Sequence, residues 1–109
     1  MDESDVNLYR VKAEVCKTFS DARRLIIISE LCHGERTVGE LACSANLAQS
    51  SVSRHLAVLR GRRLVKTRRE GTRIHYSLSG PMLGEACRVV HQLVLNQIEA
   101  ARKLAERLA

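Results

Sequence analysis

The sequence predicts a mainly α-helical domain that carries one small β-hairpin. Three observations support this fold class: helix signals recur in several segments, apolar and polar residues alternate beside one turn, and 45% of the 109 residues are hydrophobic. A chain of this length buries roughly two-thirds of its unfolded surface, so it can form a core without disulfide bonds. We therefore expect a single domain over residues 1–109.

Two helices are predicted in the first third of the chain. The first begins at about residue 6, where apolar residues start to recur at every fourth position and share one helical face: Val11, Val15 and Phe19. Ser20 or Asp21 is a suitable N-cap for the second helix, which is short and apolar. This helix is predicted to end at Gly34, because glycine tolerates the left-handed backbone of a helix end.

A third and a fourth helix follow in close succession. The segment Thr37 to Glu40 has the Ser/Thr-x-x-Glu form of a capping box, which predicts a short helix that ends at about Ser44. After a turn around Asn46, apolar residues at helical spacing predict a fourth helix with one buried face: Val52, Leu56 and Leu59. Its other face is predicted to display polar and basic side chains: Gln49, Ser50, Ser51, Ser53 and Arg54.

A basic β-hairpin is predicted next. Residues 64–69 and 73–78 flank the turn sequence Glu70-Gly71-Thr72. Within 73–78 apolar and polar residues alternate, which is the periodicity of a strand with one buried face. The apolar positions are Ile74, Tyr76 and Leu78.

The chain closes with a long predicted helix over about residues 81–108. Pro81 suits the first helical position. Residues spaced alternately four and three positions apart form a heptad-like stripe: Leu83, Cys87, Val90, Val94, Gln97, Ala101, Leu104 and Leu108. Such a helix is roughly 42 Å long at about 1.5 Å per residue, more than one small domain covers. We expect a second subunit to bury the stripe; the alternative is that it packs only on the chain's own core.

Positive charge is concentrated in one segment. Between Arg54 and Arg73 there are eight basic residues and one acidic residue, so this segment carries +7 and the rest of the chain −1. This concentration indicates an anionic partner, and nucleic acid is favoured. A membrane partner is disfavoured, because Gly61 and the hairpin turn interrupt the run and no apolar stretch reaches the roughly 20 residues that cross a bilayer. The acidic N-terminus lacks signal-peptide character, so we expect a cytoplasmic protein.

Two short helices followed by a basic hairpin match the arrangement of a winged helix-turn-helix. The helix-turn-helix would occupy about 37–60, the wing about 64–78 and a dimerisation helix about 81–108. The major groove of DNA admits an α-helix whose polar side chains read base edges. The candidate contacts from the fourth helix are Gln49, Ser50, Ser51, Ser53, Arg54 and His55, the last of these beside the DNA backbone. The candidate phosphate contacts are Arg60, Arg62, Arg63, Arg68, Arg69 and Arg73.

Six short segments of the sequence resemble a known family. They are Phe19–Leu25, Thr37–Ala42, Gln49–Arg60, Leu64–Val65, Arg68–Gly71 and Ile74–Leu78. In this order they resemble the ArsR/SmtB family of bacterial winged-helix repressors. The resemblance implies a homodimer held by the first and last helices, which binds an inverted repeat in an operator. It also implies release from DNA by an inducer: a metal or metalloid ion, or oxidation or persulfidation of a cysteine pair.

The sequence departs from the sensing sites of this family. Arsenic-sensing members often carry a Cys-Val-Cys motif at the start of the third helix, where this chain has only Cys43. Zinc-sensing members use several Asp and His residues of the last helix, and this one contains only His91. Redox-sensing members carry one cysteine in the second helix and one in the last, as this chain does with Cys32 and Cys87, although at positions displaced from the usual ones.

A second kind of sensing site is suggested by Cys87 and His91, which lie four residues apart and therefore share a helical face. A two-fold axis along the stripe would bring a second copy close, and Cys16 of the first helix would lie near that interface. Thiolate and imidazole ligands suit Zn(II), Cu(I) or As(III). The alternative is that the cysteines stay reduced and pack as small apolar side chains.

The preferred prediction is a dimeric transcriptional repressor with a thiol-dependent inducer. The alternative is a constitutive nucleic-acid-binding or architectural protein whose cysteines are only structural. An aromatic content of 3% disfavours a reader of single-stranded RNA. A small thiol enzyme is disfavoured because the sequence has no Cys-x-x-Cys motif, no glycine-rich phosphate loop and no paired catalytic carboxylates.

Overall fold

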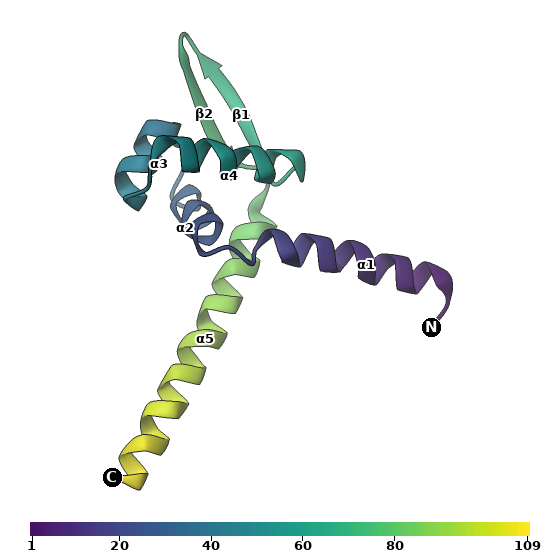
Figure 1. Ribbon diagram of the computed structural model, residues 1–109, viewed down its shortest axis with the longest axis vertical. Helices are drawn as coiled ribbons and strands as arrows, with labels where there is room; N and C mark the ends of the chain where they lie inside the picture. Colours follow the sequence, from purple (N-terminus) through teal and green to yellow (C-terminus); the bar gives the residue numbers. More distant parts are fainter.

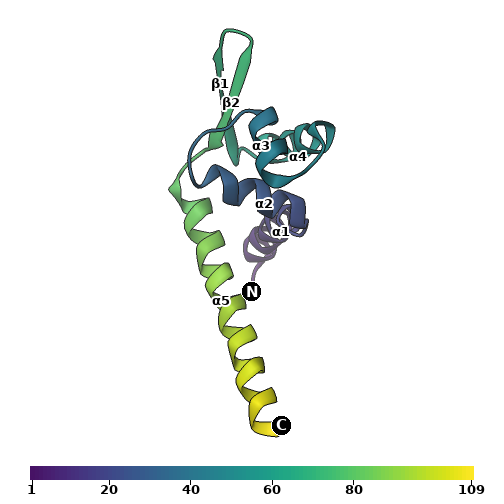
Figure 2. The same ribbon diagram turned by 90° about the vertical axis from the view of Figure 1, so that its left-hand side faces the viewer.

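The computed structural model of the chain describes residues 1–109. Its elements in chain order are α1 (Glu3–Thr18), α2 (Ala22–Leu31), α3 (Val38–Ala45), α4 (Gln49–Gly61), β1 (Val65–Glu70), β2 (Arg73–Leu78) and α5 (Pro81–Leu108). Helices α2, α3 and α4 form a small bundle from which the β1–β2 hairpin extends, while α1 and α5 point away from it in different directions (Figure 1). The hairpin and the C-terminal end of α5 lie at opposite ends of the molecule (Figure 2). The predicted fold class, a winged helix-turn-helix, is confirmed.

Side-chain caps fix where the helix-turn-helix begins. The Oγ1 of Thr37 accepts a hydrogen bond from the backbone N–H of Glu40 at 3.2 Å, and the Glu40 carboxylate accepts one from the N–H of Thr37 at 2.9 Å. This reciprocal pair confirms the predicted capping box. At the other end of α3, Asn46 adopts a left-handed conformation with φ 55°, which turns the chain into α4.

Two helix boundaries differ from the prediction. α1 begins at Glu3 rather than near residue 6, because the Asp2 side chain caps the helix and accepts a hydrogen bond from the N–H of Asp5. α2 begins after Asp21, one of the two predicted caps, but it ends at Leu31. Gly34 lies in the following loop, where its φ of +128° is a conformation that side-chain-bearing residues rarely adopt.

The core lies where α2, α3 and α4 meet the start of β1. The three residues predicted for the inner face of α4 are completely buried: Val52, Leu56 and Leu59. The other core residues are Ile27, Ile28, Leu31, Leu41 and Val65. Burial of each such side chain stabilises the fold by roughly 1.5–3 kcal/mol. Because α2 and α4 share this core, the position of α4 depends on that of α2.

The hairpin pairs in antiparallel register from Val65 opposite Leu78 to Glu70 opposite Arg73, so its turn contains two residues. Gly71 takes φ +61° in this turn, as a tight hairpin connection requires. Tyr76 and Leu78 pack against the core, but exposure along β2 does not alternate as predicted: residues 75–78 are all half-buried, and Ile74 near the tip is 37% exposed. We call the β1–β2 hairpin the wing.

Apolar side chains remain exposed along α1 and α5. In α1 they are Val6, Leu8, Tyr9 and Val11, and in α5 they include Val89, Val90, Leu93, Val94, Leu95, Ile98, Leu104 and Leu108. α1 projects from the body and does not pack along α5 of its own chain (Figure 1). The alternative in which the α5 stripe packs only on its own core is therefore wrong beyond Cys87. None of the helices combines the length and the apolar composition that a membrane span requires.

Candidate functional site

The outer face of α4 carries most of the predicted base-reading side chains. Four of them are exposed: Gln49, Ser50, Ser53 and Arg54. Because three residues of the opposite face anchor α4 in the core, these four side chains are presented on a fixed surface. Their amide, hydroxyl and guanidinium groups are the types that hydrogen-bond to base edges and phosphates.

Two predicted DNA contacts of α4 lie inside the domain. Ser51 is 9% exposed and His55 is 7% exposed, and they stand four residues apart on the face of α4 that meets the bundle. The prediction that Ser51 lies on the outer face of α4 is wrong, because the helix places this side chain on its buried side. His55, predicted to lie beside the DNA backbone, is buried as well.

Burial gives His55 an altered protonation equilibrium. Loss of solvent lowers the pKa of His55, Asp21 opposes this effect, and the positive charge of Arg23 adds to it. The Nε2 atom is buried and has no hydrogen-bond partner. His55 is therefore neutral at neutral pH, and protonation places an unsolvated charge against the core.

The stability of the domain is expected to fall in mild acid because of His55. Since its pKa is lower in the folded chain than the value of about 6.5 expected when unfolded, its contribution is present above about pH 6.5 and is lost as the pH falls through the folded value. Thermal unfolding of the wild type and of His55→Gln from pH 7.5 to 5 tests this. The wild type should lose more stability over this range than the variant, and parallel curves would contradict the assignment.

The predicted phosphate contacts divide into free and paired cations. Four of the six predicted phosphate contacts are exposed and form no ion pair with a carboxylate: Arg60, Arg63, Arg69 and Arg73. Arg62 instead forms an ion pair with Glu14 of α1 at 3.0 Å. Arg68 forms ion pairs with Glu35, in the loop between α2 and α3, and with Glu70 of the wing. These four unpaired arginines are available to bind DNA phosphates.

The predicted sensing residues gather on one side of the bundle, with one exception. Cys32, which caps the C-terminal end of α2, and Cys87 and His91 of α5 line one groove between these two helices. Apolar side chains complete its walls, among them Phe19, Leu25 and Val90. Cys16 is exposed on α1 and does not line this groove.

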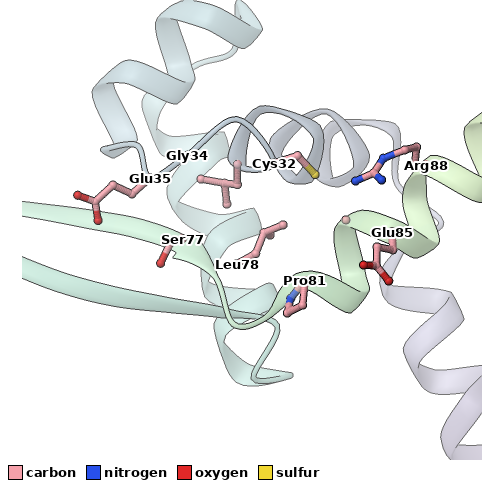
Figure 3. A pocket seen from close by; sticks show the side chains of 10 residues that line it. Cys32, Gly34, Glu35, Ser77, Leu78, Pro81, Glu85 and Arg88 are labelled. Carbon is pink, nitrogen blue, oxygen red and sulfur yellow. The ribbon is translucent and has the colours of Figure 1, made fainter.

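Cys32 and Cys87 line the same groove but have different surroundings. Burial raises the pKa of the Cys87 thiol, and the charge of Cys32 raises it further. Cys32 is exposed, and Cys87 is half-buried. In the close view of the adjoining pocket, the Cys32 sulfur points away from the wing and toward the α5 side, where Arg88 lies (Figure 3). Within one chain, no three His, Cys, Asp or Glu side chains converge to hold a metal ion.

Sequence reasoning missed the partners of the wing and the packing of α5. Glu35 carries no motif, and only the fold brings it beside Arg68 across 33 positions of the chain. Gly84 is buried, and a Cβ atom there would lie 3.2 Å from the Cys32 sulfur. The lone glycine inside a long predicted helix was the one available signal of this close approach.

Comparison with known proteins supports this description. Residues 21–67 match the family model described as "Bacterial regulatory protein, arsR family". The chain is 36% identical over 103 residues to the uncharacterized HTH-type transcriptional regulator Rv0081 of Mycobacterium tuberculosis, covering 94% of this chain and 85% of that protein.

Two solved structures have the same architecture. The homodimeric winged helix-turn-helix DNA-binding domain of Mb0332 from Mycobacterium bovis has a TM-score of 0.76 at 31% identity, covering 89% of this chain and 89% of that chain. Reduced HlyU from Vibrio cholerae has a TM-score of 0.72 at 36% identity, covering 82% of this chain and 95% of that chain. HlyU is named a transcriptional activator. The chain therefore belongs to the ArsR family of bacterial winged helix-turn-helix transcriptional regulators, which are DNA-binding proteins and not enzymes.

Proposed function

We propose that this chain is a homodimeric repressor that binds an inverted repeat in duplex DNA and is released when Cys32 and Cys87 are oxidised. The observation that carries the proposal is the juxtaposition of these two thiols in the groove between α2 and α5. α2 shares its core with α4, so a bond at this groove acts on the helix that faces DNA. Such a regulator works in the cytoplasm, where it meets its operator.

A homodimer is supported by the exposed apolar faces of α1 and α5. A monomer rarely leaves so many apolar side chains of two helices in water. An isologous interface buries the same faces of both copies and presents two α4 helices related by a two-fold axis. A DNA site with matching symmetry, an inverted repeat, is the natural target of such a dimer.

DNA recognition is supported by two kinds of exposed side chain on α4, on the segment that follows it and on the wing. The exposed polar residues of α4 suit base edges, and the four free arginines suit phosphates: Arg60, Arg63, Arg69 and Arg73. The aromatic platforms of single-strand binders are lacking on this surface, since Phe19 and Tyr76 pack against the core. Duplex DNA therefore fits it better than single-stranded nucleic acid.

The thiol chemistry follows from the different surroundings of the two cysteines. The exposed Cys32 is the accessible nucleophile, whereas the raised pKa of Cys87 keeps that thiol protonated in the resting state. Attack of the Cys32 thiolate on a hydroperoxide breaks the O–O bond, releases the alcohol or water, and leaves a sulfenic acid. Attack by Cys87 then forms the disulfide and releases water. With a polysulfide, the Cys32 thiolate attacks an S–S bond, becomes a persulfide and releases a shorter polysulfide. Attack by Cys87 on this persulfide then forms the disulfide and releases hydrogen sulfide.

Sequence-specific binding is the first property to test. Fluorescence anisotropy of the reduced protein is measured on duplex DNA from its own upstream region and on a shuffled duplex of equal composition. A repressor with an operator should prefer the first by about 1000-fold or more, whereas an architectural protein binds both equally. Addition of Zn(II), Cu(I) or As(III) to the same complex tests the metal alternative, in which Cys87 and His91 of two copies supply the ligands.

Replacement of Arg69 by alanine tests the role of the wing. We expect weaker binding to every duplex by a similar factor, and a slope of log affinity against log salt that is smaller by about 0.9, since one phosphate contact is lost. The matched control is Arg107→Ala, which removes one positive charge from the last turn of α5. A loss confined to one base position in the DNA would contradict a phosphate contact at Arg69.

A further inference from the structure

Arg68 differs from the other arginines of the wing because carboxylates hold its guanidinium. Its Nε and Nη2 atoms donate to the two carboxylate oxygens of Glu35 at 3.2 and 2.5 Å, and Nη1 donates to Glu70 at 3.0 Å. A bidentate pair of this kind fixes direction as well as distance. Hydrogen bonding to Arg68 also lowers the pKa of Glu35. A DNA phosphate would have to displace two carboxylates to reach Arg68.

The loop that contains Glu35 is also joined to the wing by backbone hydrogen bonds. The N–H of Arg36 donates to the carbonyl of Tyr76 at 3.0 Å, and the N–H of Tyr76 donates to the carbonyl of Arg36 at 2.8 Å. The Arg36 side chain donates to the carbonyl of Glu35 at 2.9 Å. The loop is therefore joined to β2 by an isolated β-bridge between Arg36 and Tyr76, and Glu35 reaches across to Arg68 on β1.

The same loop begins at Cys32. Glu35 is three positions after Cys32 along the chain, and both line the pocket between the loop, β2 and the start of α5. Figure 3 shows the two side chains pointing in opposite directions, Glu35 toward the wing and Cys32 toward α5. The sulfur of Cys32 lies close to α5 there, since a Cβ atom added at Gly84 would be 3.2 Å from it.

We propose that the ion pair between Glu35 and Arg68, which we call the tie, sets the position of the wing. In the second half of this proposal, oxidation of Cys32 disturbs the tie and thereby changes the position of the wing. Arg68 is then a positioning residue rather than a phosphate contact. The second half of this inference rests on the proposed thiol switch, and the first half does not. When Cys32 is drawn into a disulfide with Cys87, the loop shifts, and Glu35 no longer holds Arg68 in the direction that DNA binding needs.

The reduced protein tests the tie by itself. Glu35→Gln and Glu70→Gln each remove one negative charge beside Arg68, but only Glu35 lies outside the wing. Simple electrostatics predicts tighter DNA binding by both variants. The tie predicts that Glu35→Gln binds at least about fivefold more weakly than Glu70→Gln. Equal affinities of the two variants would overturn the proposal.

Exchanging the charges of Glu35 and Arg68 provides a second test of the tie. Arg68→Glu should weaken binding, and the double variant Glu35→Arg with Arg68→Glu should restore affinity to within about threefold of the wild type, because the pair is rebuilt in reverse. If Arg68 touches phosphate, the double variant stays as weak as Arg68→Glu. Thermal unfolding of each variant shows that the domain is folded, so an affinity change reports the wing.

The link to Cys32 is measured as the ratio of reduced to oxidised affinity. In Glu35→Gln this ratio should fall to less than about one-third of the wild-type ratio, while thiol titration shows the same disulfide yield. An unchanged ratio would overturn the link and leave the tie intact. If the wild type forms no Cys32–Cys87 disulfide or keeps its affinity, the proposed function fails and the link fails with it. The affinities of the reduced variants still test the tie independently.

Discussion

Replacement of Val94 by aspartate is expected to abolish the dimer and, with it, DNA binding. Val94 lies on the predicted stripe of α5 and is 44% exposed in the single chain. In an isologous interface each substitution introduces two unpaired charges into an apolar contact. An uncompensated buried charge costs about 3–5 kcal/mol, which corresponds to at least about a 100-fold weaker dimer. Separated monomers lose the second half-site, so operator affinity should fall by about 100-fold or more.

A matched variant separates this effect from a general effect of charge. Gln92 lies on the polar face of α5, where its side chain donates to Asn96, and Gln92→Asp adds the same charge there. Sedimentation velocity measures the oligomeric state of both variants, and anisotropy measures their DNA affinity. Gln92→Asp should remain dimeric and bind DNA. A dimeric Val94→Asp, or a monomer with wild-type affinity, would contradict the interface we propose.

Replacement of either cysteine of the groove is expected to remove the response to oxidant without removing DNA binding. Neither Cys32 nor Cys87 lies on the face of α4 that we assign to DNA, so the reduced affinity of Cys32→Ser and Cys87→Ser should stay within about threefold of the wild type. In the wild type, peroxide should lower affinity by a factor within the about 5- to 150-fold range of allosteric coupling. Both variants should show no decrease.

Cys43→Ser is the control for this series. Cys43 is exposed on α3 and does not line the groove, so this variant should respond as the wild type does. Mass spectrometry should find the Cys32–Cys87 disulfide in the wild type and in Cys43→Ser. Release of Cys87→Ser from DNA by peroxide would show that the switch lies at another thiol. Loss of response in Cys43→Ser would place it on α3.

Local signals were sufficient to predict most of the fold. The capping box at Thr37, the buried spacing of Val52, Leu56 and Leu59, and the turn at Gly71 each depend on neighbours within a few residues. Such features are encoded locally, and the structure confirms them. The same local reasoning identified four of the five predicted outer residues of α4, and apolar residues of the stripe along α5 that are exposed in the single chain.

The parts that the sequence did not reveal depend on contacts between distant residues. Nothing near Arg62 or Arg68 indicates that Glu14 and Glu35 pair with them, so both arginines resembled free phosphate contacts. Burial of Ser51 depends on how α4 is rotated against α2. A run of serines carries little information about that rotation, because small polar side chains are tolerated on either face.

The most direct test of the proposed function is a single cycle of oxidation and reduction on DNA. The reduced wild-type protein is bound to labelled duplex from its own upstream region, peroxide or polysulfide is added, and a dithiol reductant follows while anisotropy and thiol content are recorded. We predict that anisotropy falls as two thiols per chain are lost and returns when the reductant restores them. If the complex persists with both thiols oxidised, the chain remains a DNA-binding regulator, but its cysteines do not control it.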